Sequence, residues 1–133
     1  MGSIDTFRIS NGTVGMATNV DTIPVVSLPD SSTINWDAST ASNAVVKLNH
    51  NLTSRIFSKP HNLVSGQTYT LTLIQDTVGG AAVIFDSSIT IASSINTQPM
   101  YKTIITFKAS GSGTSATLNS LVVAYQLDKT QTI

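Results

Sequence analysis

The clearest hydrophobic pattern in the chain is the alternation within residues 68–75. The large apolar residues in one phase are Tyr69, Leu71 and Leu73. This period of two is typical of a strand with one buried side. After Asp76 to Gly80, which contains two glycines, Val83 and Phe85 resume the alternation. Because glycine supplies the positive φ that longer hairpin loops need, the stretch from Asn62 to Phe85 predicts an antiparallel β-hairpin.

Short strands at close spacing are predicted along the rest of the chain. They are Thr33 to Trp36, Ala44 to Leu48, Thr53 to Phe57, Ile89 to Ile91, Lys102 to Lys108 and Ser120 to Leu127. The connections between them are rich in Ser, Asn, Gly and Pro, which favour turns. This spacing predicts one all-β domain over residues 32–133, a single antiparallel β-sandwich with a jelly-roll-like arrangement. No stretch predicts a helix longer than two turns.

Residues 1–31 carry little patterned hydrophobicity and predict an extended N-terminal arm. Pro24 and Pro29 restrict the backbone and cannot donate hydrogen bonds to a sheet. Residues 23–28 are therefore predicted to be an edge or interface segment rather than a central strand. Two alternatives stay open for the arm, a disordered terminus and an ordered segment that docks on a partner.

The last predicted strand is apolar on both faces. Leu121 to Leu127 contains four aliphatic residues, an alanine and a tyrosine. Either a subunit interface or a covering N-terminal arm would shield its second face. The candidate partner-interface residues are Phe7, Ile9, Ile23, Val25, Leu121, Val123 and Tyr125. In contrast, Tyr101 to Lys108 alternates apolar with polar residues and predicts a half-buried strand with a solvated outer face.

Composition narrows the class of protein. The chain has 133 residues, seven basic and seven acidic side chains, and no cysteine. A chain with balanced charges lacks the basic surface that binds nucleic acids or anionic membranes. The absence of cysteine excludes disulfides and thiolate metal sites. All seven acids are Asp, and the 18 Ser and 19 Thr residues favour strands and turns over helices. Since few surface charges suit a protein in permanent contact with other subunits, the composition also indicates assembly.

No targeting segment is predicted. The first ten residues lack the apolar core of a secretory signal peptide. No run approaches the roughly 18 apolar residues that a membrane-spanning helix requires. We therefore expect synthesis in the cytoplasm without secretion, and no membrane partner.

No combination of residues predicts catalysis, a cofactor or a metal. His50 and His61 lack the close spacing that places two imidazoles on one metal, although an ion shared with Asp37 or Asp86 remains an alternative. Asp76 and Asp86 are interpreted as turn residues rather than a pair of glycosidase carboxylates. Serine is plentiful, but none lies in a nucleophile-elbow motif. We expect a protein that is not an enzyme.

Aromatic residues that would stack on a glycan are scarce. Trp36 is the only tryptophan and is predicted to lie in the core or an interface. Tyr69 and Tyr125 are predicted to be core residues. Tyr101, at the start of a strand, is the best candidate for an exposed aromatic.

Several of these features together resemble a β-sandwich module of tailed-bacteriophage virion proteins. The shared pattern is an Ile34-Asn35-Trp36 segment before a strand pair, followed by Gly66-Gln67-Thr68-Tyr69, Gln75-Asp76, Gly79-Gly80, and then Val83 and Phe85. The match covers approximately residues 33–108. The resemblance implies a trimeric, non-enzymatic part of the virion, as in tail fibres, tail spikes and head-decorating proteins. After Phe85 the chain has Asp86-Ser87-Ser88 where the family often has Pro and Trp, which leaves any binding feature at that corner in doubt.

Two functions fit this resemblance. Because only about 32 residues precede the module, the first hypothesis is a homotrimeric capsid decoration (cement) protein that binds the major capsid protein or another virion protein on the head surface. Its binding to the assembled shell would stabilise that shell by mass action. The alternative is a receptor-binding or tail- or head-fibre module that recognises a host surface glycan.

Overall fold

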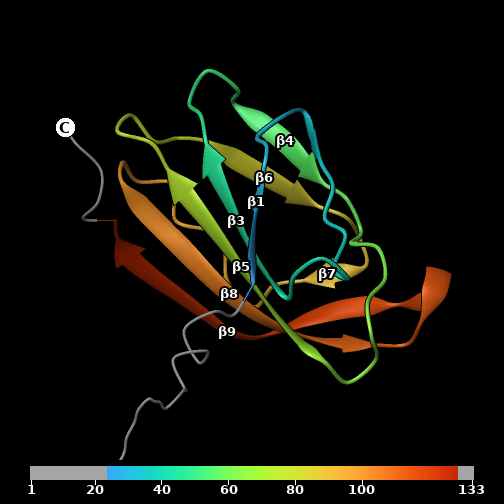
Figure 1. The fold of residues 1–133 in the computed structure, drawn as a ribbon. Coiled ribbons are helices and arrows are strands. Elements are labelled where there is room, and N and C mark those ends of the chain that lie inside the picture. The colour runs from blue at the N-terminus through green and yellow to red at the C-terminus, as the bar shows by residue number, and fades with distance from the viewer. Residues whose placement is uncertain (1–23, 129–133) are drawn as a thin grey trace, which may run out of the picture.

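The computed structural model describes residues 24–128. Within them, a six-stranded sheet with the order β1-β3-β5-β8-β9-β7 faces a three-stranded sheet with the order β2-β4-β6 (Figure 1). The strands are β1 (Val25–Leu28), β2 (Thr33–Ile34), β3 (Asn43–Leu48), β4 (Ser54–Phe57), β5 (Thr68–Gln75), β6 (Ala82–Phe85), β7 (Ile89–Thr90), β8 (Tyr101–Ser110) and β9 (Thr117–Leu127). The described residues contain one short 3₁₀ turn, Gly113–Ser115, so the all-β prediction is confirmed.

The first six strands alternate between the two sheets. β1, β3 and β5 pair in parallel in the large sheet, and β2, β4 and β6 pair in parallel in the small one. In Figure 1 the arrows of β3 and β5 run one way and those of β4 and β6 run back. The arrangement is solenoid-like, since each turn of the chain adds one strand to each sheet.

The predicted antiparallel sandwich or jelly roll is therefore wrong in its strand pairing. Of the seven pairings between described strands, five are parallel and two are antiparallel. Parallel neighbours need a crossover connection, and here the strand in the opposite sheet provides it. Alternation along the sequence shows which side of a strand is buried, but it does not identify the neighbouring strand.

The predicted hairpin from Asn62 to Phe85 is also wrong. β5 pairs with β3 and β8, whereas β6 pairs with β4 in the other sheet. At the corner between them, the buried Gln75 amide donates to the Ala81 carbonyl at 2.8 Å and accepts from the Ala81 N–H at 3.0 Å. This side chain takes the place of a strand neighbour, so the chain can leave the sheet without unpaired backbone groups.

Gly79 serves this corner by allowing a close approach. Its φ is +76°, and a Cβ at this position would lie 2.7 Å from the Pro99 nitrogen and the Thr97 oxygen. Glycine is required because the corner packs directly against the backbone of residues 97–99.

β8 and β9 complete the large sheet in antiparallel pairings. β8 buries Thr103, Ile105, Phe107 and Ala109, while its other face is half-buried or exposed, so the predicted half-buried strand is confirmed. A β-bulge between Thr106 and Phe107 leaves Leu121 of β9 without a partner residue. β1, within the predicted arm, forms the edge of the large sheet beside β3, as predicted for an edge segment.

The core lies between the sheets. Trp36 is fully buried there, packs edge-to-face on Tyr69 with ring centroids 5.9 Å apart, and donates from Nε1 to the Ala41 carbonyl at 3.2 Å. The core predictions for Trp36 and Tyr69 are confirmed. The core prediction for Tyr125 is wrong, because 45% of this residue is exposed. Tyr101, the predicted exposed aromatic, is half-buried.

A buried arginine joins three successive corners of the coil. The Arg55 side chain is 0% exposed and forms an ion pair with Asp30, with Nε and Nη2 donating to the two carboxylate oxygens at 2.8 and 2.9 Å. Nη2 also donates to the Asn49 carbonyl at 3.1 Å, and Nη1 donates to the Ala82 carbonyl at 3.0 Å. Because these acceptors lie in the corners after β1 and β3 and at the start of β6, one guanidinium holds three turns in register.

The Asp76 carboxylate organises the same end of the molecule. Oδ1 accepts from the backbone N–H of Val78 and of Gly79, both at 2.9 Å. Oδ2 accepts from the His50 N–H at 2.7 Å and lies 2.7 Å from His50 Nδ1. Desolvation raises the pKa of Asp76, but the hydrogen bonds from His50, Gly79 and Val78 outweigh it and hold the pKa well below its ordinary value. The interpretation of Asp76 as a turn residue is confirmed.

Replacing Arg55 should destabilise the fold strongly. Arg55→Ala removes the cation that pairs with the Asp30 carboxylate and one donor to each of two carbonyls, which should lower the free energy of unfolding by about 3–5 kcal/mol. Urea denaturation followed by circular dichroism measures this change. Lys47→Ala, which removes an exposed cation, should change it by less than about 0.5 kcal/mol. A loss below about 1 kcal/mol for Arg55→Ala would contradict the role assigned to the guanidinium.

Asp76 should make the free energy of unfolding depend on pH in the acidic range. Its pKa is lower in the folded chain than the unfolded value of about 3.9, so its contribution is complete above that value and is lost as pH falls toward the folded pKa. Asp76→Asn should lower the free energy of unfolding at pH 7 by about 1–3 kcal/mol and flatten its decline below about pH 4. Urea titrations between pH 7 and pH 2.5 test this.

His50→Ala is the control for this experiment, because it keeps the backbone N–H that Asp76 accepts. It should retain most of the decline in stability. An equally steep decline in Asp76→Asn and the unchanged protein would rule out Asp76 as its source.

Candidate functional site

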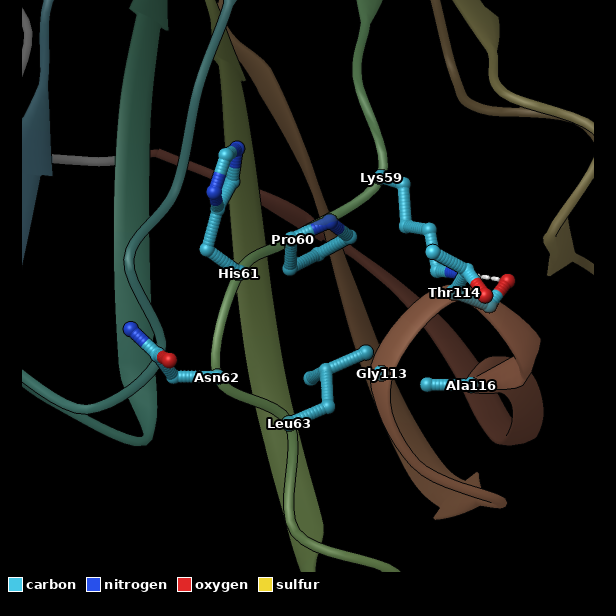
Figure 2. Close-up of a pocket in the computed structure, with 8 residues that line it drawn as sticks. All are labelled: Lys59, Pro60, His61, Asn62, Leu63, Gly113, Thr114 and Ala116. Carbon is cyan, nitrogen blue, oxygen red and sulfur yellow. Dashed lines mark hydrogen bonds between the residues drawn. The ribbon is translucent and has the colours of Figure 1, made fainter.

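Two connections form a groove at the end of the strands opposite the Arg55 corners. The segment from Lys59 to Leu63 enters β5, and the segment from Gly113 to Ala116 joins β8 to β9. Their groove has a volume of approximately 680 Å³ and is broadly open to solvent. Figure 2 shows Pro60 and Leu63 in the middle, with Lys59 and Thr114 on one side and His61 and Asn62 on the other.

The floor of the groove is apolar and its rims are polar. Leu63 and Ala116 are buried, and the Pro60 ring is also buried. His61 and Asn62 are exposed on one rim. On the other, Lys59 Nζ donates to the Thr114 carbonyl at 2.5 Å, which links the two connections. The groove therefore combines a small apolar base with hydrogen-bonding groups at its edges.

Hydrogen bonds to the preceding turn hold the His61 rim in place. The His61 N–H donates to the Trp36 carbonyl, and the His61 carbonyl accepts from the Ala38 N–H, both at 2.9 Å. Asn62 has a φ of +61° and donates from Nδ2 to Asp37 Oδ1 at 2.9 Å. Asparagine is among the few residues that adopt this conformation readily, so the rim has a defined backbone rather than a variable one.

Asp37 stays ionised beside this rim. The hydrogen bond from the Asn62 side chain, followed by those from the Ser39 hydroxyl and N–H, holds the pKa of the Asp37 carboxyl below its ordinary value. Asp86 likewise accepts from the Ser88 hydroxyl and N–H, and these bonds lower its pKa. The interpretation of Asp86 as a turn residue is confirmed.

The two histidines lie at opposite ends of the strands. His50 follows β3 and His61 precedes β5, so the structure does not bring them together. Among residues 24–128, no group of three His, Cys, Asp or Glu side chains is placed to hold a metal ion. In the same range, no helix is long and apolar enough to cross a membrane.

The candidate interface residues fall into two groups. Phe7, Ile9 and Ile23 lie outside the described residues. Val25, Leu121 and Tyr125 are 58%, 57% and 45% exposed, whereas Val123 packs partly against the core. The Tyr125 hydroxyl donates to the Ser94 carbonyl at 2.5 Å. Val25 lies on one edge strand of the sheet and the other three lie on β9, four strands away in the sheet order.

Neither the groove nor the role of Arg55 is predicted by the sequence pattern. Lys59 and Thr114 are 55 positions apart, and only the tertiary structure brings them together. For Arg55 a signal existed, because it shares the phase of Phe57 in β4 and Phe57 is buried. A charged residue in the buried phase of a strand predicts a buried ion pair.

Comparison with known proteins gives one family. The family model described as "Putative phage tail fibre C-terminal domain" matches residues 37–114, more than half of the 133 residues. No curated protein and no solved structure matches the chain. The matched range contains β3 to β8 and Lys59, His61, Asn62 and Thr114 of the groove. The predicted resemblance to a phage virion module is confirmed, and the chain is a phage structural protein that belongs to the tail fibre C-terminal domain family.

Proposed function

We propose that this chain is the homotrimeric, non-enzymatic end module of a phage tail fibre, and that it recognises a host surface glycan through the groove between residues 59–63 and 113–116. The observation that carries the proposal is the tail-fibre family match, which includes nearly all of the groove. A module at the end of a fibre is exposed to the host surface, so its loop ends are suited to receptor contact.

The family match favours the fibre alternative over capsid decoration. The first hypothesis relied on the short segment before the module rather than on residues that bind a shell. The matched family is described by its place in a tail fibre. We therefore propose location at the fibre rather than the capsid surface.

The chemistry of the groove suits a hydroxyl-rich ligand. Sugars bind proteins through several hydrogen bonds together with apolar contact on the flatter side of the ring. Here the Pro60 and Leu63 side chains offer the apolar contact, while the His61 ring, the Asn62 amide and the Lys59 ammonium are available at the rims. Since Asp37 fixes Asn62, the amide is oriented before the ligand arrives, which reduces the entropy lost on binding.

Removing the Lys59 and His61 side chains from the two rims tests the glycan site. The double variant Lys59→Ala/His61→Ala should bind glycan at least about tenfold more weakly, because one hydrogen bond to a charged group contributes about 1.5–3 kcal/mol. The backbone bonds of His61 are kept in this variant, so circular dichroism should be unchanged. Binding of the labelled full chain to an array of bacterial lipopolysaccharides and capsular polysaccharides measures the effect.

The matched control is Lys47→Ala/His50→Ala, which removes an exposed lysine and an exposed histidine at the opposite end of the strands. It should bind like the unchanged chain. Equal loss in both double variants would place recognition elsewhere. Binding to isolated phage heads without binding to any glycan on the array would overturn the fibre proposal in favour of decoration.

A further inference from the structure

The outer face of the six-stranded sheet has an uncharged centre. The registered neighbours across five strands form two adjacent rows, Val25-Asn43-Thr70-Thr106-Val122 and Ser27-Val45-Thr72-Ile104-Ala124. All ten side chains lie on the face away from the core and are half-buried or exposed. Aliphatic groups and threonine methyls thus cover the middle of this face, where a solvent-facing sheet ordinarily carries charged residues.

Charges on this face are confined to the rows on either side of the centre. One outer row is Lys47-Ile74-Lys102-Gln126, and the other is Thr68-Lys108-Asn119. The described part of the face carries three lysines and no acidic residue. An uncharged centre with a polar rim is the arrangement found in protein interfaces.

β9 forms one margin of this surface. None of its eleven residues is charged. Val122, on this face, is 56% exposed, and Leu121, at the bulge, is 57% exposed. Tyr125 and Leu127 share the core-facing phase of Val123, so their 45% and 41% exposed side chains lie on the other side of the sheet. On its outer side, β9 pairs with β7 at Leu118 and Asn119, and the described residues place no strand beside the rest of it. Proteins ordinarily cover a long apolar edge strand that has no charged residues, because its unpaired backbone groups could pair with another chain.

We infer that this face is the subunit contact of the trimer, with the same face of the other copies as its occupant. The inference rests on the proposed homotrimer and adds the surface that forms it. When such faces pack together, no charged side chain is buried in the contact, since the lysines lie at the rim and their long aliphatic stems can turn outward. A nucleic acid would instead require cations in the centre of the face.

The size of the face is of the same order as that of a subunit contact. Five strands about 4.8 Å apart and four rows about 6.7 Å apart give a flat area of about 500 Å². The accessible surface is larger than this flat area because the side chains project from it. A standard interface uses about 800 Å² of accessible surface from each partner. A threefold axis parallel to the strands then brings three equivalent faces together.

Light scattering coupled to size-exclusion chromatography tests the surface on the full chain. The unchanged chain should have the mass of three copies. Ile104→Arg and Thr72→Arg, both central on the face, should shift the mass to one copy at micromolar concentration, because a cation is then buried against its symmetry equivalents. Circular dichroism should be unchanged, since both side chains point away from the core.

Ile84→Arg is the matched control. Ile84 is an isoleucine in a strand, 58% exposed, on the outer face of the small sheet. It should leave the trimer mass unchanged. A trimer that survives both central substitutions, or one that Ile84→Arg dissociates, would overturn the assigned surface while leaving the proposed trimer intact. A monomeric unchanged chain would overturn the trimer itself, and neither result alters the glycan-array test of the groove.

Discussion

The buried guanidinium of Arg55 is the interaction on which the coil of strands depends. Parallel strands that alternate between two sheets lack a local hairpin to fix their register, so their corners must be tied together by other groups. Arg55 does this by donating to Asp30 and to the carbonyls of Asn49 and Ala82. Without its acceptors the charge would be costly to bury, and without the charge the Asp30 carboxylate would lose the cation that pairs with it. The corners and the arginine therefore require one another.

The two ends of the coil of strands are held by different groups. His50, Asp76 and the Gln75 amide bind backbone groups of neighbouring corners, so that end is committed to structure. The groove end is held by Asn62 on Asp37, by Lys59 on Thr114 and by the backbone bonds of His61. Both ends lie within or beside the range that the tail fibre family model matches, residues 37–114.

The same architecture accounts for the low charge of the chain. A coil of strands has two outer sheet faces, and in an isolated protein both would be solvated. Here the large face is uncharged at its centre and bounded by lysines, while the small face exposes Ile56 and Ile84 as registered neighbours. Self-association through the large face, as inferred above, would explain why only 11% of the residues are charged in a chain of this size.

The sequence by itself determined the strands, their buried sides and the family. The ranges of β5 and β6 agree with the prediction, as do the core positions of Trp36 and Tyr69, because alternation and glycine placement are local properties. Only the tertiary structure decided which strands are neighbours. The corner after β5 was interpreted as a hairpin because its glycines suit one, whereas Gly79 allows contact with residues 97–99 and Gln75 replaces a strand partner. Residues distant in sequence are joined by the strand pairing, by the Arg55 network and by the Lys59–Thr114 contact. The periodicity of a sequence carries no information about contacts over such distances.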